Sequence, residues 1–335
     1  MKMMSVAALA ASLLIGGSIA AYATDRGGVM TYGRYADSLF LDPVLNDANV
    51  DIWILSNIYD TLLLPTDDGQ GVQPGLATEW KVSDDGLTVT LKLRADTKFS
   101  DGSPILPSDV VWSLKRAATP DLGIWGFLVS AIKDVTGSDD GTVVITLNRA
   151  DPSIIPALTV FNTAIMPQKL FEATPGATDA DKAKAFAEHP VGSGPFMFES
   201  WERGASMKLV KNPYYWAMGD DGKPLPYLDG VTFEVIPDDA TRILKLQSGD
   251  LDGAEFIPYA RVEELKSADN LDMKLFPSTK IEYVTLNVRP QIEGKDNPLS
   301  NVKVRQALNY ATNKDALIQI VTMGVGTPMK SFMSS

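Results

Sequence analysis

The stretch VTFEVIPDDATRILKLQSGDLDGAEFI, residues 231–257, carries the pattern that decides the fold. Its first six residues predict a strand, and its last four predict a second strand. Between them, Asp238 or Asp239 can cap a helix, and Gly249 can end it. A strand–helix–strand unit of this kind predicts a parallel or mixed sheet that is covered by helices. The sequence therefore favours the α/β fold class.

Upstream of that unit, two segments are typical of β-hairpins. Residues 78–82 and 87–94 flank Asp84-Asp85-Gly86, and residues 133–136 and 142–147 flank Asp139-Asp140-Gly141. An Asp-Gly pair between β-branched residues is a strong hairpin signal, because glycine accepts the positive φ of the turn. None of these acidic turns has the ligand spacing of a calcium-binding EF-hand loop, so we interpret them as turns alone.

Apolar residues at helical spacing mark several further segments. Residues 50–62 predict an amphipathic helix, and Ser108 or Asp109 can begin another helix between the two hairpins. Near the end of the sequence, Asn301 and Asn313 each begin a predicted helix. A hairpin-rich segment therefore lies between pieces of an α/β lobe.

The N-terminus has the three parts of a secretory signal peptide. Lys2 supplies a positive charge, residues 6–20 are apolar, and Ala21-Tyr22-Ala23 offers a cleavage site. The apolar stretch is shorter than the roughly 20 residues that a membrane span needs. We therefore expect cleavage near Ala23, export through the Sec pathway to the periplasm, and no stable membrane insertion afterwards. An uncleaved anchor is the alternative.

Composition argues against several function classes. The net charge of −12 argues against nucleic acid or an anionic membrane as the main partner. The lack of cysteine excludes disulfides, thiolate metal sites and a cysteine nucleophile. His189 is the only histidine, so neither a zinc site nor a Ser-His-Asp triad is favoured. We expect no cofactor, no metal and no catalysis, and a glycosidase-like carboxylate pair stays open as an alternative.

Trp125 lies in an aromatic loop whose other members include Gly123, Gly126 and Phe127. A large apolar face is therefore predicted at a loop tip, where its exposure calls for an explanation. Contact with a ligand is one interpretation, and core packing, the default role of tryptophan, is the other.

Eight strings in a fixed order along the chain carry a family resemblance. They are LDP (41–43) with YDTLL (59–63), PGLATEW (74–80), FSDGSP (99–104) with DVV (109–111), VGSGPF (191–196), WERG (201–204), KNPYYW (211–216), LQSGDLD (246–252) and VKVRQALNYA (302–311). On these strings the chain resembles the family 5 extracellular solute-binding proteins, the peptide- and nickel-type receptors of ABC importers.

The resemblance implies a two-lobed, periplasmic binding protein-like fold of type II with an extra β-rich inserted subdomain. Residues 24–62 and 186–275 would form the first α/β lobe, residues 63–185 the insert, and residues 276–335 the start of the second lobe. Family members continue well past this length. We therefore expect the second lobe to be incomplete at Ser335.

The resemblance also implies where a ligand binds. The loop after LDP faces the ligand in relatives, which points to Asn46, Asp47 and Asn49. The aromatic loop of the insert approaches the cleft, which points to Trp125 and Phe127. For the three polar residues, a solvated loop that caps the following helix is the alternative. The charged groups that clamp peptide termini in relatives lie largely in the second lobe, beyond the end of this sequence.

The implied function is capture of a di- or oligopeptide-like solute by a monomer, which closes on it and delivers it to the permease subunits of an ABC importer. Opines, oligosaccharides and nickel chelates are alternative ligands. A secreted hydrolase with an unrecognised carboxylate pair is the alternative from another function class, and a chain without activity is a third.

Overall fold

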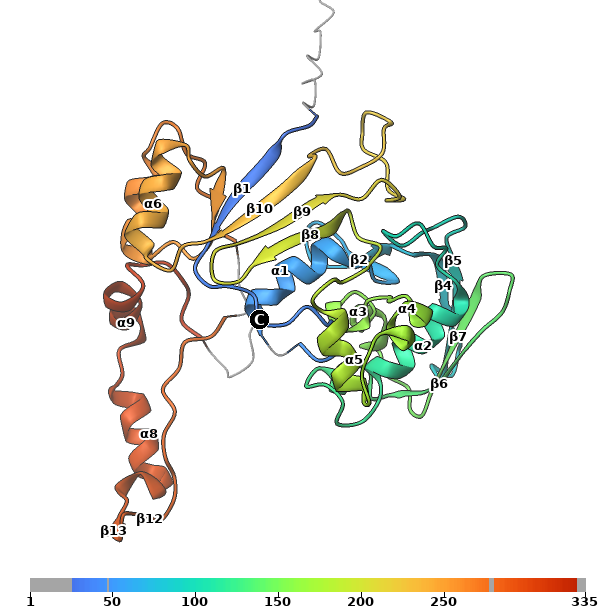
Figure 1. The fold of residues 1–335 in the computed structure, drawn as a ribbon. Helices are drawn as coiled ribbons and strands as arrows, with labels where there is room; N and C mark the ends of the chain where they lie inside the picture. Colours follow the sequence, from blue (N-terminus) through green and yellow to red (C-terminus); the bar gives the residue numbers. More distant parts are fainter. Residues whose placement is uncertain (1–25, 47, 277–279, 330–335) are drawn as a thin grey trace, which may run out of the picture.

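The computed structural model describes residues 26–46, 48–276 and 280–329, and Figure 1 shows its fold. The expected signal peptide, residues 1–23, lies outside the described residues. Among the residues that are described, no helix is long and apolar enough to cross a membrane.

A mixed five-stranded sheet forms the centre of the first lobe (Figure 1). In the order of the sheet, its strands are β11 (Gly253–Ala254), β1 (Val29–Arg34), β10 (Gly230–Val235), β9 (Ser206–Lys211) and β8 (Phe196–Glu202). β1 pairs in parallel with both β10 and β11, whereas β9 runs antiparallel to β10 and β8. The prediction of a parallel or mixed sheet is confirmed. β1, which no sequence pattern predicted, lies between the two predicted strands.

Helix α6 (Asp239–Ser248) connects β10 to β11, as predicted. Asp238 caps this helix by accepting a hydrogen bond from the Thr241 amide at 2.8 Å, and Gly249 ends it with a φ of 81°. The second strand is shorter than predicted, because the chain turns out of the sheet at Phe256, which has a φ of 54°.

A four-stranded antiparallel sheet forms the centre of the insert. Its strands, in sheet order, are β4 (Ala77–Val82), β5 (Thr88–Leu93), β7 (Thr142–Leu147) and β6 (Ile132–Gly137), so both predicted hairpins are confirmed. In the first turn, the Asp85 carboxylate accepts hydrogen bonds from the Leu87 amide and the Ser83 hydroxyl, and Gly86 has a φ of 68°. Asp140 makes the same pair of contacts in the second turn.

Helix α2 (Pro107–Ala117) lies against the insert sheet and contacts β6 and β7. It begins before the predicted Ser108 or Asp109, because Pro107 is suited to the first helical position. Asp109 instead stabilises the first turn by accepting a hydrogen bond from the Leu106 amide at 2.8 Å.

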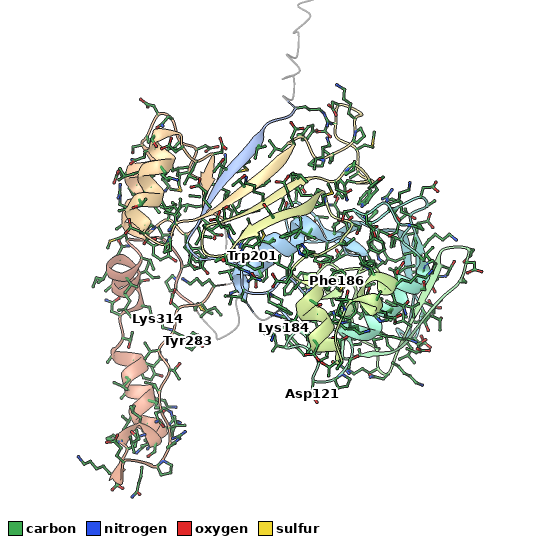
Figure 2. All side chains as sticks on the ribbon, viewed as in Figure 1. Asp121, Lys184, Phe186, Trp201, Tyr283 and Lys314 are labelled. Carbon is green, nitrogen blue, oxygen red and sulfur yellow. The ribbon has the colours of Figure 1, made fainter. Side chains whose placement is uncertain are left out.

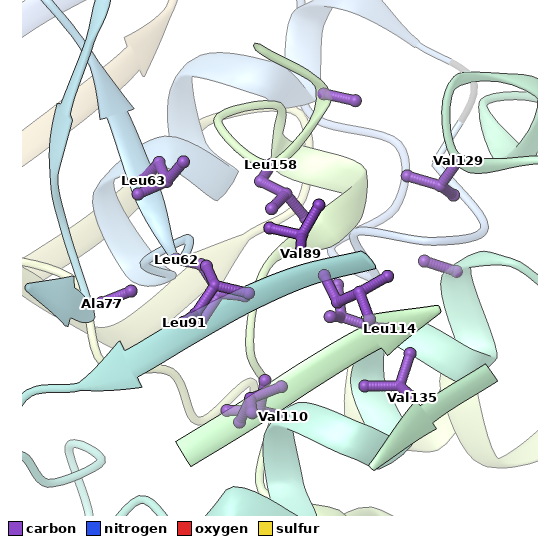
Figure 3. Packing of buried hydrophobic residues seen from close by; sticks show 14 of the residues in the cluster. Leu62, Leu63, Ala77, Val89, Leu91, Val110, Leu114, Val129, Val135 and Leu158 are labelled. Carbon is purple, nitrogen blue, oxygen red and sulfur yellow. The ribbon is translucent and has the colours of Figure 1, made fainter. Parts of the chain in front are cut away.

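Two clusters of buried apolar side chains hold these layers together. Figure 3 shows the first, in which Val110 and Leu114 of α2 pack near Leu91 of the insert sheet. The second joins the first-lobe sheet to α1 (Asn49–Ile58), the helix predicted over residues 50–62, through side chains such as Ile54 and Phe233. Each such buried side chain contributes about 1.5–3 kcal/mol of apolar transfer free energy.

Short elements complete the lobe and the insert. They are β2 (Leu63–Pro65), β3 (Val72–Pro74), α3 (Ile154–Ala157), α4 (Gln168–Ala173), α5 (Asp179–Phe186) and α7 (Val262–Lys266), with 3-10 turns at Gly126–Val129, Phe161–Thr163 and Tyr259–Arg261. α4 lies within residues 63–185, yet its Phe171 belongs to the cluster that contains α1, as does Phe186 at the end of α5. The domain bounds drawn from the sequence stay a prediction.

The last described segment extends away from the first-lobe sheet (Figure 1). It contains β12 (Gln291–Ile292), β13 (Lys295–Asp296), a 3-10 turn at Pro298–Ser300, α8 (Val302–Ala311) and α9 (Lys314–Val321). Asn301 and Asn313 cap the two helices through their side-chain oxygens, as predicted. Neither helix has a buried residue, and Tyr310 and Ile320 are 90% and 70% exposed.

Candidate functional site

The loop after β1 is tied to the insert by a buried guanidinium. Arg116 of α2 donates to Asp42 at 3.1 Å and makes a two-point contact with Asp179, at 2.7 and 2.9 Å. Asp42 also accepts hydrogen bonds from the amides of Val44 and Leu45. The side chains of Arg116 and Asp42 are 3% and 0% exposed, so this pairing fixes the path of the LDP loop.

Asn46 holds the same loop from inside. Its side-chain amide donates to the Phe40 carbonyl at 3.0 Å and to Asp51 at 2.7 Å, and its oxygen accepts from the Ala48 amide at 3.2 Å. Burial raises the pKa of Asp51. Asn46 is 0% exposed, so its polar atoms are already satisfied within the loop.

The other two polar candidates differ from Asn46. Asn49 begins α1 and is exposed. Asp47 lies outside the described residues. Ligand contact by all three residues of this loop stays a prediction, and Asn49 is the one whose side chain is seen to be accessible.

The aromatic loop of the insert presents Phe127 to solvent and keeps Trp125 behind it. Phe127 is 65% exposed, while Trp125 is half-buried and meets Phe161 edge-to-face at 5.7 Å. The Trp125 indole N–H is buried and has no hydrogen-bond partner among the described residues. The rings of Trp125 and Phe127 nevertheless lie close, with centroids 6.2 Å apart.

The structure brings the two predicted binding segments together. A Cβ atom at Gly123 would stand only 2.0 Å from the Val44 carbonyl oxygen, so the aromatic loop lies directly on the LDP loop and needs glycine there. Leu45, Ile124 and Phe127 line the same open hollow of about 1060 Å³. Asn46 and Asn49 do not line it.

A second candidate region lies at the carboxyl edge of the first-lobe sheet, which sequence reasoning missed. β1, β10 and β11 are parallel, and ligands of open α/β sheets bind outside the carboxyl ends of such strands. At this edge Arg34 ends β1 and pairs with Glu255 at 3.2 Å, and both side chains are nearly buried. Arg34 also donates to Ser38 at 3.1 Å and to the Val50 carbonyl.

Two aromatic rings stand at that edge. Tyr35 follows β1, Phe256 follows β11, and their ring centroids are 4.4 Å apart at an interplanar angle of 54°. Phe256 is 56% exposed. Farther along the loop after β1, Asp37 accepts hydrogen bonds from the Trp201 indole at 3.0 Å and the Gly204 amide at 2.7 Å. Figure 2 shows Trp201 on the first-lobe sheet.

The glycine-rich string before β8 has a packing role. A Cβ atom at Gly192 would stand 2.2 Å from the Ile58 carbonyl oxygen, and one at Gly194 would stand 2.6 Å from the Asn57 carbonyl oxygen. The Gly194 amide donates to the same Ile58 carbonyl at 2.8 Å. These glycines let the chain lie directly against the end of α1, and nothing in this arrangement resembles a nucleophile elbow.

Asp60 is a buried acidic side chain whose pKa is raised far above its ordinary value. Burial raises its pKa to about 7, even though its carboxylate accepts a hydrogen bond from the Trp216 indole at 2.7 Å. The Arg94 guanidinium stacks on Trp216 at 4.0 Å. A raised pKa is typical of general acids, but Asp60 is only 4% exposed, so a substrate has no access to it.

The single histidine, His189, packs beside an aromatic ring, and the described residues form no metal-ligand group. The His189 ring meets Phe198 edge-to-face at 6.0 Å. Among residues 26–46, 48–276 and 280–329, no three His, Cys, Asp or Glu side chains are grouped so that they could hold a metal ion. The two regions described above, at the aromatic loop and at the carboxyl edge of the sheet, are the candidates for ligand contact.

Comparison with known proteins agrees with this interpretation. Residues 71–335 match the bacterial extracellular solute-binding proteins, family 5 Middle. The glutathione-binding protein GsiB of Pectobacterium atrosepticum is 36% identical over 254 residues, which cover 76% of this chain and 46% of that protein. GsiB of Salmonella choleraesuis is 32% identical over 319 residues, covering 95% and 58%. The chain thus spans about half the length of these curated relatives.

Solved structures share the fold. The periplasmic binding protein DppA from Helicobacter pylori, in complex with peptide STSA, has a TM-score of 0.73 at 26% identity, covering 91% of this chain and 60% of that chain. The oligopeptide-binding protein AppA from Bacillus subtilis, in complex with a nonapeptide, has a TM-score of 0.75 at 27% identity, covering 92% and 58%. AgaA from A. tumefaciens R10, in complex with agropinic acid, has a TM-score of 0.71 at 27% identity, covering 90% and 57%.

A mixed sheet that carries a hairpin-rich insert, together with these neighbours, defines a periplasmic binding protein-like fold, and the expected fold class is confirmed. The chain belongs to the bacterial extracellular solute-binding proteins of family 5.

Proposed function

We propose that this chain captures a di- or oligopeptide-like solute in the periplasm for uptake by an ABC importer. The observation that carries the proposal is the shared fold with receptors solved in complex with peptides, at 26% and 27% identity. In this proposal the protein is a monomer without catalytic activity or cofactor, its signal peptide is cleaved near Ala23, and it delivers ligand to permease subunits.

The first-lobe wall of the site is proposed to include Asn46, Asp47, Asn49, Trp125 and Phe127. The contact between the LDP loop and the aromatic loop supports this grouping. Phe127 offers the accessible apolar area, and the half-buried Trp125 supports it from behind. Residues 24–62 and 186–275 are proposed as the first lobe, residues 63–185 as its insert, and residues 276–335 as the beginning of the second lobe.

Ligand capture follows from a difference in affinity between two conformations. A solute that touches both lobes binds the closed state more tightly than the open state. The difference between the two binding free energies is the free energy by which the solute favours closure. An extended peptide can be held largely through its backbone, so selectivity for side chains can stay broad.

Isothermal titration calorimetry of the purified chain with a panel of di-, tri- and pentapeptides tests the proposal. We expect stoichiometric binding without turnover, and a loss of roughly tenfold in affinity for Trp125→Ala and Phe127→Ala. Leu244→Ala is the matched control, because Leu244 is 64% exposed on α6, outside the proposed wall. Hydrolysis of the peptides, or equal affinity of all three variants, would contradict the proposal.

Glutathione is the second candidate ligand, because the curated relatives are named glutathione-binding proteins. Agropinic acid, the opine seen with AgaA, is the third. Both belong in the same titration panel. Tighter binding of either one than of every peptide would replace the peptide proposal.

A further inference from the structure

The aromatic pair at the carboxyl edge of the first-lobe sheet is placed where a ligand could reach it. Tyr35 and Phe256 follow neighbouring parallel strands, β1 and β11, and their rings meet at 4.4 Å. Phe256 keeps more than half of its surface exposed. A half-buried tyrosine beside an exposed phenylalanine at this edge of a parallel sheet is suited to contact with a bound molecule.

Hydrogen bonds from a buried arginine hold the backbone at Phe256 in place. A φ of 54° is rare for a bulky residue other than glycine, and such conformations persist where the surroundings impose them. Arg242, which is 0% exposed, donates to the carbonyl oxygens of Glu255 at 3.1 Å, Phe256 at 2.9 Å and Ile236 at 2.7 Å. A buried guanidinium therefore fixes an exposed ring in a disfavoured backbone conformation.

On the other side of the pair, the chain that carries Tyr35 is held through its neighbours. The residue before it, Arg34, is bound to Glu255 and Ser38, and Asp37 two residues later is bound to Trp201 and Gly204. The backbone beside both rings is thus held before any ligand arrives, which lowers the entropy that ordering this edge would cost on binding.

The charged groups beside the pair are already paired with each other. Arg34 and Glu255 form a nearly buried ion pair, and Arg242 is occupied by carbonyl oxygens and by Asp239 at 2.5 Å. A ligand that meets Tyr35 and Phe256 therefore finds aromatic surface and a phenol, and these neighbouring cations are engaged elsewhere. That chemistry suits an aromatic or large aliphatic group better than a carboxylate.

We propose that Tyr35 and Phe256 form a contact surface for an aromatic or bulky apolar side chain of the captured solute, and that they give the receptor a preference for such peptides over acidic ones. This inference rests on the proposed function and deepens it by naming the class of side chain.

Three tripeptides that differ only in the middle residue test the inference: Ala-Phe-Ala, Ala-Ala-Ala and Ala-Glu-Ala. Calorimetric titration of the wild-type chain should give about tenfold tighter binding of the phenylalanine peptide than of the alanine peptide. The glutamate peptide should bind no more tightly than the alanine peptide.

Two substitutions remove the ring without opposing the backbone. Phe256→Gly and Phe256→Asn both suit a positive φ, so each should keep or raise the thermal midpoint of unfolding. Each should abolish the preference for phenylalanine while leaving the affinity for Ala-Ala-Ala within about twofold. Leu244→Ala, at a site of similar exposure on α6, should keep the preference.

The outcomes separate this inference from the proposed function. Peptide binding with no preference in the wild type, or with a preference that survives Phe256→Gly, overturns the contact surface and leaves the peptide receptor intact. This is also the expected outcome if the two rings pack against the second lobe. Binding of none of these three tripeptides overturns the contact surface, and the proposed function falls with it only if the di- and pentapeptides of the first panel also fail to bind.

Discussion

Asp60 lies buried where the end of α1 meets the insert, and burial raises its pKa from an ordinary value of 3.8 to about 7. Its charged and titratable neighbours are Arg94, which favours the ionised form, and Tyr215, whose own pKa is raised by burial and by Asp60. The Trp216 indole donates to its carboxylate. Replacing Asp60 by Asn removes the titration and keeps an oxygen that can accept this hydrogen bond.

The direction of the pH effect follows from the raised pKa. Below pH 3.8 the carboxyl group is protonated in both the folded and the unfolded chain, so it contributes nothing to the pH dependence. Between pH 3.8 and 7 the unfolded chain loses the proton while the folded chain keeps it, and the free energy of unfolding falls as pH rises. At about 1.4 kcal/mol for each pH unit, the full loss is about 4 kcal/mol above pH 7.

Urea unfolding of wild-type and Asp60→Asn chains, followed by circular dichroism from pH 4 to pH 8, measures this difference. The free energy of unfolding of Asp60→Asn, relative to that of wild type, should be about 4 kcal/mol higher at pH 8 than at pH 4. Asp68→Asn is the control, because a hydrogen bond from Thr66 lowers the pKa of that exposed carboxyl group, so the group is ionised in both states over this range and the variant should run parallel to wild type. Parallel curves for wild type and Asp60→Asn would refute the reasoning.

Three further substitutions test the packing. Arg116→Met should cost about 3–5 kcal/mol in urea unfolding, because it leaves Asp42 buried without its cation, and a second change, Asp42→Asn, should recover part of that loss. Gly192→Ala should cost about 1–3 kcal/mol, since its Cβ atom would collide with the Ile58 carbonyl, and a fully stable variant would contradict the close approach. Gly249→Ala, which has free space but a φ of 81°, should cost only about 1 kcal/mol by the same measurement.

Local signals predicted the regular elements well. The Asp-Gly turns at Gly86 and Gly141 defined both hairpins, because positive φ at those positions is a property of a few adjacent residues. The same holds for Asp238 and Gly249, which cap and end α6 through contacts within one helical turn. Boundaries that depend on nearby backbone chemistry are therefore readable from the sequence.

The candidate site was harder to predict, because its geometry depends on contacts between distant residues. β1 has no turn signal of its own and becomes a central strand only by pairing with β10 and β11. Without β1, the shared carboxyl edge and the Tyr35–Phe256 pair could not be located. Phe256 had instead been placed within a strand, and the bonds from Arg242 that turn it outwards are not visible in any local pattern.

For the site residues inferred from the family resemblance, too, the observed contacts could not be predicted from local sequence. The aromatic loop was expected to expose Trp125, whereas Phe127 is the more exposed ring and Trp125 packs on Phe161. Asn46 is predicted to face a ligand, and in the structure its amide also holds the loop together through Asp51. The hydrogen-bond partners of such a residue depend on the folded structure. Residue type and position alone therefore could not decide between contact with a ligand and a role in holding the loop together.

The pairing of β1 has a consequence for how the chain acquires its structure. Val29 pairs with Gly230, and Tyr32 pairs with Gly253, so the earliest strand to be synthesised must wait for partners that are made much later. The hairpins of the insert need only neighbouring residues, and local contacts form faster than distant ones. Hydrogen-exchange pulse labelling should accordingly find the amides of β5 and β7 protected before those of β1, leaving the nascent first strand open to chaperones for most of its synthesis.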